Sequence, residues 1–246
     1  MLYFLIPCYN ESGNIRQLVK NIKSKVKKNK FKIILIDDGS TDNTKQIAKN
    51  LSLHFPLKRL GYTANKGPGF AFKVGFDWLI PRLKKSDLVI TMEADNTSDY
   101  KILLKMIANT QKFDLVLASP YAKGGSLQGV PAYRVVLSKA ANLLDALVFQ
   151  VQDIKTYSSF YRAYRSSILK KAKKIYKDKL VEENGFSVFV ENLIKLNQIG
   201  ASMIEVPAIV NWQKRQGKSK LNLFRSIKGH LSLYFNYLNG KYKIAK

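Results

Sequence analysis

Residues 87 to 99 read DLVITMEADNTSD and join a short apolar run directly to a group of acidic and polar side chains. Leu88 to Met92 have the length and composition of a strand that is buried on both faces, as parallel sheets require. At the carboxyl edge of such a sheet, the loops between strands and helices form a crevice in which ligands bind. If the chain stays extended, Glu93 and Asp95 point to the same side, about 7 Å apart.

Two carboxylates in this arrangement suit a hard cation. Mg²⁺ and Mn²⁺ prefer carboxylate oxygens in combination with the phosphates of a substrate. The triplet Glu93-Ala94-Asp95 is therefore a candidate site for a metal ion and a diphosphate. A helix cap or a solvated turn would produce the same triplet, so the rest of the chain has to decide between them.

Composition sets the class of protein. A chain of 246 residues with 46% hydrophobic content can form one large α/β domain. Its single cysteine, Cys8, excludes an internal disulfide and fits a reducing compartment. The net charge of +25, from 42 basic and 17 acidic residues, predicts a polyanionic partner: nucleic acid, an anionic membrane or a phosphorylated substrate.

The hydrophobic segments are too short for targeting or membrane insertion. Residues 2 to 6, LYFLI, lack a preceding basic region and are followed by Pro7, so they predict a strand rather than a signal peptide. No window approaches the roughly 20 apolar residues that span a bilayer. We expect a protein that is soluble or lies on a membrane surface.

Strand-like and helix-like patterns alternate through the first half of the chain. Strands are expected at residues 2–7, 31–36, 57–62, 87–92 and 113–118, and helices at 13–28, 41–53, 70–83 and 99–110. Ser40 is the expected N-cap of the second helix. This alternation predicts an α/β fold with a mostly parallel, doubly wound sheet that is flanked by helices and has right-handed crossovers.

The pattern changes in the second half. A flexible loop is expected at 123–126, helices at 132–150 and 186–198, an aromatic segment at 157–164 and a strand at 201–210. No repeat or linker is visible, so both halves should pack as one unit.

The last 36 residues are basic and amphipathic. Residues 211–246 contain nine Lys or Arg and no acid, and the apolar residues Leu223, Phe224, Ile227 and Leu231 share one helical face. This face either lies on anionic lipid or packs on the domain. His230 is expected at a helix end or on the surface.

Several short motifs occur in one order: IPCYNES at 6–12, IDDGSTDNT at 36–44, NKG at 65–67, MEAD at 92–95, EVP at 205–207 and GKSKL at 217–221. Together they resemble the family-two glycosyltransferases with a GT-A fold, and they are most similar to the branch of dolichol-phosphate and polyprenol-phosphate mannosyltransferases and glucosyltransferases. The similarity covers nearly the whole chain. It implies a Rossmann-like catalytic domain at 1–210, with a nucleotide-binding half at 1–118 and an acceptor half at 119–210, and a C-terminal segment at 211–246.

The resemblance also implies a donor site. Glu93 and Asp95 match an Asp-x-Asp metal motif whose first acid is Glu in this chain. Thr97 stands where relatives often carry a metal-binding Gln, so Mg²⁺ or Mn²⁺ would be held by Glu93, Asp95 and Thr97. The nucleotide would be bound by Pro7, Tyr9, Glu11, Asp38, Lys66, Glu93, Ala94 and Asp95.

The acceptor site follows from the same resemblance. A lipid phosphate would be bound by Arg134, Ser138, Lys214, Arg215 and Ser219. Trp212 precedes the basic pair and either packs in the domain or contacts the lipid or sugar. The chain departs from the family pattern at Pro120, where relatives carry Arg, and at Thr156 and Phe160, where they carry Asp and Gly.

The function implied is that of a metal-dependent, inverting glycosyltransferase. It would move a hexose from a nucleotide sugar of the GDP-mannose or UDP-glucose type to a polyprenyl phosphate, with Asp95, Arg134 and Arg215 as catalytic residues. A phosphate is already largely dianionic at pH 7, because its second pKa is about 6, and so needs no strong general base. Peripheral attachment to the cytoplasmic face of a membrane, with or without a separate membrane-protein partner, is expected, and binding to nucleic acid is not.

Two alternatives remain open from the sequence. Transfer to a glycan hydroxyl would need a carboxylate base, for which Asp153, Glu182, Glu183 and Glu191 are available. A non-catalytic basic module would bind nucleic acid or membrane through its charge alone and would show strong salt dependence.

Overall fold

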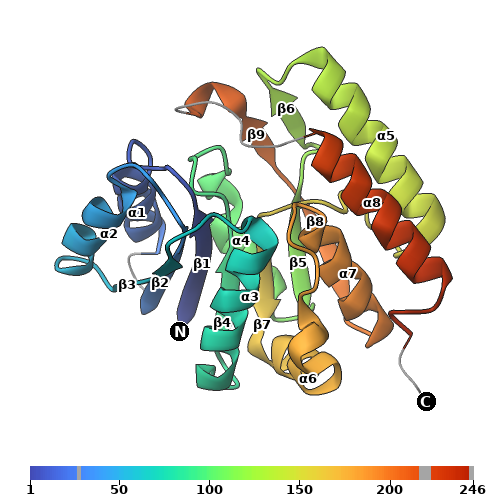
Figure 1. Ribbon diagram of the computed structural model, residues 1–246, viewed down its shortest axis with the longest axis horizontal. Helices are drawn as coiled ribbons and strands as arrows, with labels where there is room; N and C mark the ends of the chain where they lie inside the picture. Colours follow the sequence, from blue (N-terminus) through green and yellow to red (C-terminus); the bar gives the residue numbers. More distant parts are fainter. Residues whose placement is uncertain (27–28, 216–222, 244–246) are drawn as a thin grey trace.

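The computed structural model describes residues 1–26, 29–215 and 223–243, and within them a seven-stranded sheet runs through the centre of the molecule (Figure 1). Its strands, in spatial order, are β3 (Leu57–Tyr62), β2 (Phe31–Asp38), β1 (Leu2–Cys8), β4 (Leu88–Thr91), β7 (Arg162–Arg165), β5 (Leu115–Ser119) and β8 (Met203–Pro207). Neighbouring strands are parallel except at β7, which is antiparallel to both β4 and β5. The predicted mostly parallel sheet is confirmed.

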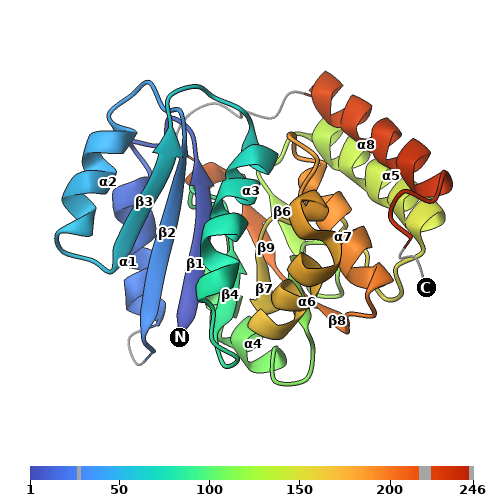
Figure 2. The ribbon, with the colours of Figure 1, turned by 60° about the horizontal axis from the view of Figure 1, so that its bottom comes forward.

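Helices cover both faces of this sheet (Figure 2). They are α1 (Ile15–Lys25), α2 (Thr44–Ser52), α3 (Pro68–Leu79), α4 (Leu103–Asn109), α5 (Ala132–Phe149), α6 (Ser166–Tyr176), α7 (Val188–Gln198) and α8 (Leu223–Leu238). Successive strand residues enter opposite cores: Ile34 belongs to the core that includes residues of α3, α6 and α7, whereas Leu35 belongs to the core that includes residues of α1, α2 and α4. Continuous apolar runs in the strands therefore supply two cores at once.

The sequence patterns missed β7 and α6. The segment RAYR at 162–165 is framed by two arginines and does not look like a buried strand, yet Arg162 is fully buried. Its guanidinium donates to the backbone oxygens of Ser159, at 2.7 Å, and Tyr157, at 2.8 Å. These bonds satisfy the polar headgroup, which is what permits an arginine in the middle of the sheet.

The strand expected at 201–210 is two strands. Pro207 ends β8 because it has no N–H to continue the ladder. The chain then leaves the main sheet, and β9 (Ile209–Asn211) pairs in parallel with β6 (Ser126–Gln128). The flexible loop expected at 123–126 thus leads directly into a strand, and a short 3-10 helix, η4 (Trp212–Lys214), follows β9.

The prediction that Ser40 caps the second helix is wrong, because α2 begins at Thr44. Ser40 Oγ instead accepts a hydrogen bond of 3.0 Å from the backbone of Asn10. Asn10 Oδ1 accepts in turn from the backbone of Thr41 at 2.8 Å. These bonds join the loops after β1 and β2, two of the loops at the carboxyl edge of the sheet.

Helices α5 and α8 lie side by side at one end of the molecule (Figures 1 and 2). Asp145, buried on α5, accepts hydrogen bonds at its Oδ1 from Tyr234 Oη, at 2.9 Å, and faces His230 Nδ1 at 3.0 Å. Leu233 of α8 is fully buried. The placement of His230 as an isolated surface or helix-end residue is therefore wrong, since it links two helices.

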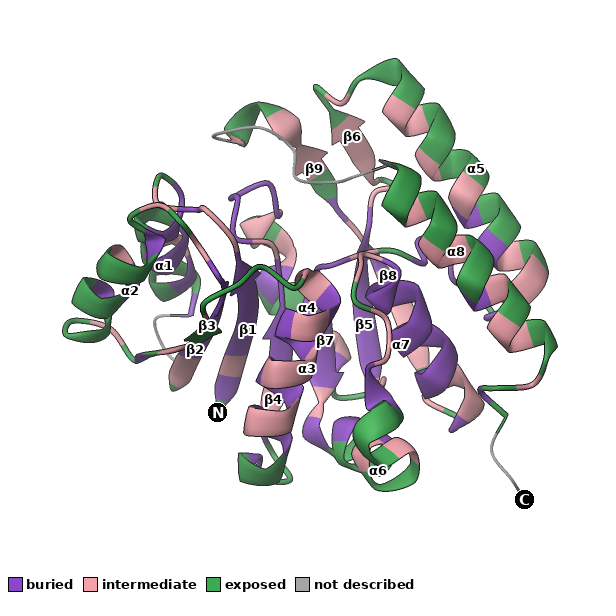
Figure 3. Cartoon of the chain, in the orientation of Figure 1, coloured by how far each residue is buried: buried purple, intermediate pink, exposed green. Residues whose placement is uncertain are grey.

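The outer sides of these two helices are exposed, as the green segments of α5 and α8 in Figure 3 indicate, and many of the side chains there are apolar. We call this surface the α5–α8 apolar face, and it consists of Tyr133, Val136, Leu137, Leu143, Leu144, Leu147, Phe224, Ile227, Leu231, Phe235 and Leu238. The C-terminal helix thus packs on the domain with one side and presents apolar residues on the other. Among the described residues, no helix has the length and apolar character needed to cross a membrane.

The first turn of α3 packs closely against the backbone at Glu183, in the second half of the chain. A Cβ added at Gly69, in the first turn of α3, would lie 1.8 Å from the carbonyl oxygen of Glu183. We expect Gly69→Ala to destabilise the fold by at least about 2 kcal/mol through overpacking, which is a fall in Tm of roughly 4–8 °C. At Gly185 an added Cβ would meet Ser187 Oγ at 3.7 Å, so Gly185→Ala is the matched control. Equal melting temperatures for the two variants would contradict the contact.

Candidate functional site

The acidic triplet lies beyond the end of β4. The strand ends at Thr91, so Glu93 and Asp95 belong to a loop, and the expected strand-like alternation through them is wrong. The loop turns at Asn96, whose φ of 63° is left-handed. Asparagine adopts this conformation more readily than most residues. Here it is buried, and its amide donates to the backbone oxygen of Asn14 at 3.1 Å.

Asp95 is held by its own loop at one oxygen and faces a cation at the other. Its Oδ1 accepts hydrogen bonds from the backbone of Thr97, at 3.1 Å, and from Thr97 Oγ1, at 2.7 Å. Its Oδ2 lies 3.4 Å from Nη1 of Arg215. Thr97, expected as a metal ligand, therefore fixes the rotamer of Asp95 in this geometry. The Asp95 side chain is 9% exposed, which strengthens its electrostatic interactions.

Glu93 lies close enough to Asp95 for their charges to interact. Burial of the carboxyl group, and next the charge of Asp95, raise the pKa of Glu93 from its ordinary value of 4.5 to about 7. Ser98 Oγ donates to Glu93 Oε2 at 2.9 Å, which favours the charged form but does not offset burial. A cation between the two carboxylates would relieve their repulsion.

These two carboxylates are the side chains that could hold a divalent metal ion. Within residues 1–26, 29–215 and 223–243, no group of three or more His, Cys, Asp or Glu side chains could do so. A pair of carboxylates suits an ion such as Mg²⁺, which keeps several waters and takes its remaining ligands from substrate phosphates. The donor set therefore fits a cation that binds together with a phosphorylated substrate.

A tryptophan connects the basic residues. The centroid of the Trp212 ring lies 5.0 Å from Cζ of Arg134 on α5 and 5.6 Å from Cζ of Arg215. Both distances fit cation–π contacts. Arg134 Nε also donates to Tyr133 Oη at 3.1 Å. Asp95, Arg215, Trp212 and Arg134 thus form one continuous series of contacts from the acidic loop to α5.

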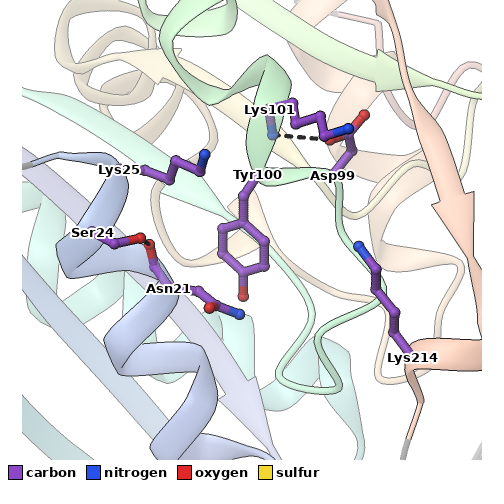
Figure 4. Close-up of a pocket in the computed structure, with 7 residues that line it drawn as sticks. All are labelled: Asn21, Ser24, Lys25, Asp99, Tyr100, Lys101 and Lys214. Atoms are coloured by element: carbon purple, nitrogen blue, oxygen red, sulfur yellow. Dashed lines mark hydrogen bonds between the residues drawn. The ribbon is translucent and has the colours of Figure 1, made fainter.

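The expected basic pair is divided in space. Arg215 faces Asp95, whereas Lys214 lines a cavity of about 220 Å³ with Asn21 and Tyr100 (Figure 4). This cavity lies between α1 and the short helix η2 (Tyr100–Ile102). Asp99, Lys25 and Lys101 also line this cavity. The sequence neighbours Lys214 and Arg215 therefore contact different residues, although a second pocket places Lys214 beside Asn96, the residue that follows Asp95.

The other expected acceptor residues are placed as follows. Ser138 lies one turn after Arg134 on α5, and Ser138 Oγ is 3.5 Å from Asn142 Nδ2. Ser219 lies outside the described residues. Thr156, one of the positions that depart from the family pattern, shares a hydrogen bond between its Oγ1 and Oγ of Ser119, so two neutral hydroxyls pair there.

Asp38 organises a loop rather than presenting a bare carboxylate. Its Oδ1 accepts from Tyr62 Oη at 2.7 Å and from the backbone of Lys66 at 2.8 Å. Its Oδ2 accepts from Asn65 Nδ2 and from the backbone of Gly67, both at 2.9 Å. These four donors fill the usual acceptor capacity of a carboxylate. Asp38 therefore shapes the NKG loop beside the proposed nucleotide site.

The remaining residues expected at the nucleotide lie at the same sheet edge. Pro7 is buried near the end of β1, and Tyr9 follows it in the loop. Glu11 is buried and accepts from Asn14 Nδ2 at 2.6 Å. Lys66 is exposed, with Nζ 4.5 Å from the centroid of the Phe70 ring, and Ala94 is buried between the two acids.

Three contributors to the site were missed or undecided in the sequence. Asn96 makes the turn, Ser98 holds Glu93, and Trp212 joins the arginines. The run DNTSD carried a signal for the first two, because Asn favours left-handed turns and Ser and Thr bond nearby side chains. Nothing in the sequence could place Trp212 beside Arg134, which precedes it by 78 positions.

Comparison with known proteins adds the family. The model described as "Glycosyl transferase family 2" matches residues 3–172. Dolichol-phosphate mannosyltransferase of Pyrococcus furiosus is 30% identical over 246 residues, which cover 98% of this chain and 63% of that protein. Polyprenol monophosphomannose synthase of Mycolicibacterium smegmatis is 30% identical over 221 residues, or 89% of this chain and 80% of that protein. The chain thus spans less than two thirds of the Pyrococcus protein.

A solved structure supports the fold. Glucosyl-3-phosphoglycerate synthase of Mycobacterium tuberculosis, in complex with Mn²⁺, uridine diphosphate and glucosyl-3-phosphoglycerate, superposes with a TM-score of 0.66 and 16% sequence identity. The similarity covers 100% of this chain and 81% of the other.

The raised pKa of Glu93 predicts how stability depends on pH. Its value of about 7 in the folded chain, against 4.5 ordinarily, means that the folded state holds this proton more tightly than the unfolded state. Without metal ions, the stability that this group contributes therefore falls as pH rises from about 4.5 to about 7. We expect Glu93→Gln to have a higher Tm than the unchanged chain at pH 8 and a nearly equal Tm at pH 4, below the ordinary pKa of Glu, measured in EDTA. A gain of the same size at both pH values would refute the shift. Asp178→Asn, at a side chain that is 93% exposed, is the control.

Proposed function

Since the chain belongs to glycosyl transferase family 2, we propose that it transfers a hexose from a nucleotide sugar to a polyprenyl phosphate. The two relatives that are 30% identical are named for mannose and for dolichol or polyprenol phosphate. These names favour mannose over glucose as the transferred sugar, and they favour a lipid phosphate as acceptor.

The observation that carries this proposal is the contact series from Asp95 through Arg215 and Trp212 to Arg134. Asp95 is on the donor side of the reaction and Arg134 on the acceptor side. One tryptophan and one ion pair span the distance between them. A site that must bring two anionic phosphates together needs acidic metal ligands and arginines within one cluster, and this cluster supplies both.

On the donor side, Glu93 and Asp95 would hold Mg²⁺ or Mn²⁺, with Thr97 orienting Asp95. When bound, the metal ion acts as a Lewis acid that stabilises the departing nucleoside diphosphate. We assign the base and ribose to the loops that contain Pro7, Tyr9, Glu11 and Lys66. Asp38 contributes by holding the backbone of Lys66 and Gly67 in place.

On the acceptor side, Arg134 and Arg215 would bind the lipid phosphate, aided by Ser138, Lys214 and Ser219. A guanidinium pairs with phosphate oxygens through two parallel hydrogen bonds, which fixes the direction of the nucleophile. A phosphate oxygen then forms a bond to the anomeric carbon as the bond to the nucleoside diphosphate breaks on the opposite side, and the configuration inverts. Because the phosphate is already anionic, the residues only need to position it and neutralise charge.

Transfer to a glycan hydroxyl is the second candidate, and the available acids argue against it. Glu191 is fully buried and pairs with Lys195 at 2.6 Å, while Glu182 pairs with the same ammonium at 2.9 Å. Glu183 accepts from Ser187 Oγ at 2.6 Å. Three of the four carboxylates that could act as a base are thus engaged in holding the fold.

A lipid acceptor requires access to a membrane, and we propose the α5–α8 apolar face as the surface that docks. Arg134 stands in the first turn of α5, so the proposed acceptor site and this face share a helix. The charge of +25 would add attraction to anionic lipid. We place the protein peripherally on the cytoplasmic face of a membrane, alone or with a membrane-protein partner. Residues 1–210 would form most of the catalytic domain, with its donor half at 1–118 and its acceptor half at 119–210. Residues 211–246 would add Trp212 and Arg215 to the site and α8 to the docking face.

A transfer assay tests the proposed reaction. Protein, GDP-mannose, Mn²⁺ and a polyprenyl phosphate in detergent should yield a lipid-linked hexose, with UDP-glucose assayed in parallel. Asp95→Asn should lower the rate at least about 100-fold, because it removes charge stabilisation at the leaving group. Asp178→Asn, which makes the same charge change on the surface, should leave the rate unchanged. Transfer to a sugar acceptor but to no polyprenyl phosphate would overturn the acceptor assignment.

Sedimentation with vesicles tests the docking surface. Phe235 on α8 is 70% exposed. We expect Phe235→Asp to weaken binding to vesicles with anionic lipid by about tenfold, since it removes an aromatic side chain that docking would bury in the membrane. Leu53 is 76% exposed and directly follows α2, which lies at the opposite end of the molecule from α5 and α8 (Figure 1). Leu53→Asp should therefore bind like the unchanged chain. Equal weakening by both variants would indicate general charge effects and refute the assigned face.

A further inference from the structure

We infer that Arg215 and a divalent cation compete for the same oxygen, Oδ2 of Asp95, so that the metal ion binds tightly only together with a nucleoside diphosphate. This inference rests on the metal site of the proposed function. It assigns to Arg215 a positioning role on the donor side in addition to the proposed contact with the acceptor phosphate.

The competition follows from how Asp95 uses its two oxygens. Oδ1 accepts two hydrogen bonds from Thr97, at 3.1 and 2.7 Å, which leaves Oδ2 as the better ligand for a cation. Arg215 Nη1 lies 3.4 Å from that same Oδ2. The Arg215 side chain is 17% exposed, so water screens this ion pair only in part.

A bare cation would therefore have to displace Arg215. A divalent ion at Oδ2 and a guanidinium beside it would repel each other in a site that contains little water. The Glu93 carboxylate offers limited compensation, because Ser98 Oγ already donates a hydrogen bond of 2.9 Å to its Oε2. The metal ion alone should therefore bind weakly.

A nucleoside diphosphate reverses this effect. Its phosphates bring negative charge to the metal ion and offer oxygens to which a guanidinium can bind in place of Asp95. Trp212 keeps the guanidinium in the site during the exchange, since its ring centroid lies 5.6 Å from Arg215 Cζ. Arg215 thus opposes the metal ion without nucleotide and supports it with nucleotide.

The test measures Mn²⁺ affinity from the electron paramagnetic resonance signal of free Mn²⁺, with and without GDP, and with UDP in parallel. Without nucleotide, Arg215→Gln should bind Mn²⁺ about fivefold more tightly than the unchanged chain, a coupling of ordinary size. With nucleotide, the same variant should bind Mn²⁺ more weakly than the unchanged chain. Arg215→Ala should change the affinity in the same directions.

Lys112→Gln is the matched control. It makes the same change in charge at an exposed residue just before β5, at the amino edge of the sheet and so opposite the Asp95 loop. Its Mn²⁺ affinity without nucleotide should equal that of the unchanged chain. If Lys112→Gln tightens Mn²⁺ binding as much as Arg215→Gln does, overall charge explains the effect and the inference is wrong.

Asp95→Asn separates failure of this inference from failure of the proposed metal site. Loss of Mn²⁺ binding in Asp95→Asn, with no change in Arg215→Gln under nucleotide-free conditions, overturns the competition and leaves the metal site in place. Unchanged Mn²⁺ binding in Asp95→Asn overturns the metal site itself. Tighter binding in Arg215→Gln together with lost binding in Asp95→Asn supports both.

Discussion

The left-handed turn at Asn96 is the constraint on which the geometry of the site depends. Asn96 donates to the backbone oxygen of Asn14, and its Oδ1 lies within 3.3 Å of donors on Asn21 and Tyr100. Two residues of α1 and its N-cap, distant in sequence, and one residue four positions along the chain therefore fix Asn96 in a conformation that most side chains avoid. Because the chain turns there, Thr97 comes back to Oδ1 of Asp95 and leaves Oδ2 directed at Arg215. This backbone turn therefore determines which oxygen of Asp95 faces Thr97 and which faces Arg215.

The position of the basic residues on the proposed acceptor side depends on the pairing of β6 with β9. The two strands are parallel, so the elements that follow them begin at the same end. β6 leads into α5, which carries Arg134, and β9 leads into η4, which contains Trp212. A pairing of three residues in each strand thus brings together two arginines that are 81 positions apart in the chain (215 − 134). Pro207 makes this possible by ending β8 and releasing the chain from the main sheet.

Sequence reasoning succeeded where local patterns decide structure. The alternation of apolar runs and amphipathic helices gave the parallel sheet, and Glu93 and Asp95 do lie at its carboxyl edge. It failed where tertiary contacts decide. Arg162 is a charged residue in a buried strand, stabilised by backbone oxygens that only the folded loop supplies. In the same way, the divergence of Lys214 from Arg215 depends on what each side chain meets in space, which neighbouring positions in the sequence do not reveal.

Helix α5 joins recognition of the phosphate to the surface proposed for docking. Its 18 residues span about 27 Å, with Arg134 in the first turn and exposed apolar residues along the outer side. Its inner side is fixed by Asp145, which binds His230 and Tyr234 of α8, so the two helices present their apolar residues as one rigid surface. A lipid phosphate has its charge at the membrane surface and its chain below. A helix that places a guanidinium at one end of an apolar stripe matches that arrangement, because docking brings the arginine to the depth of the headgroups.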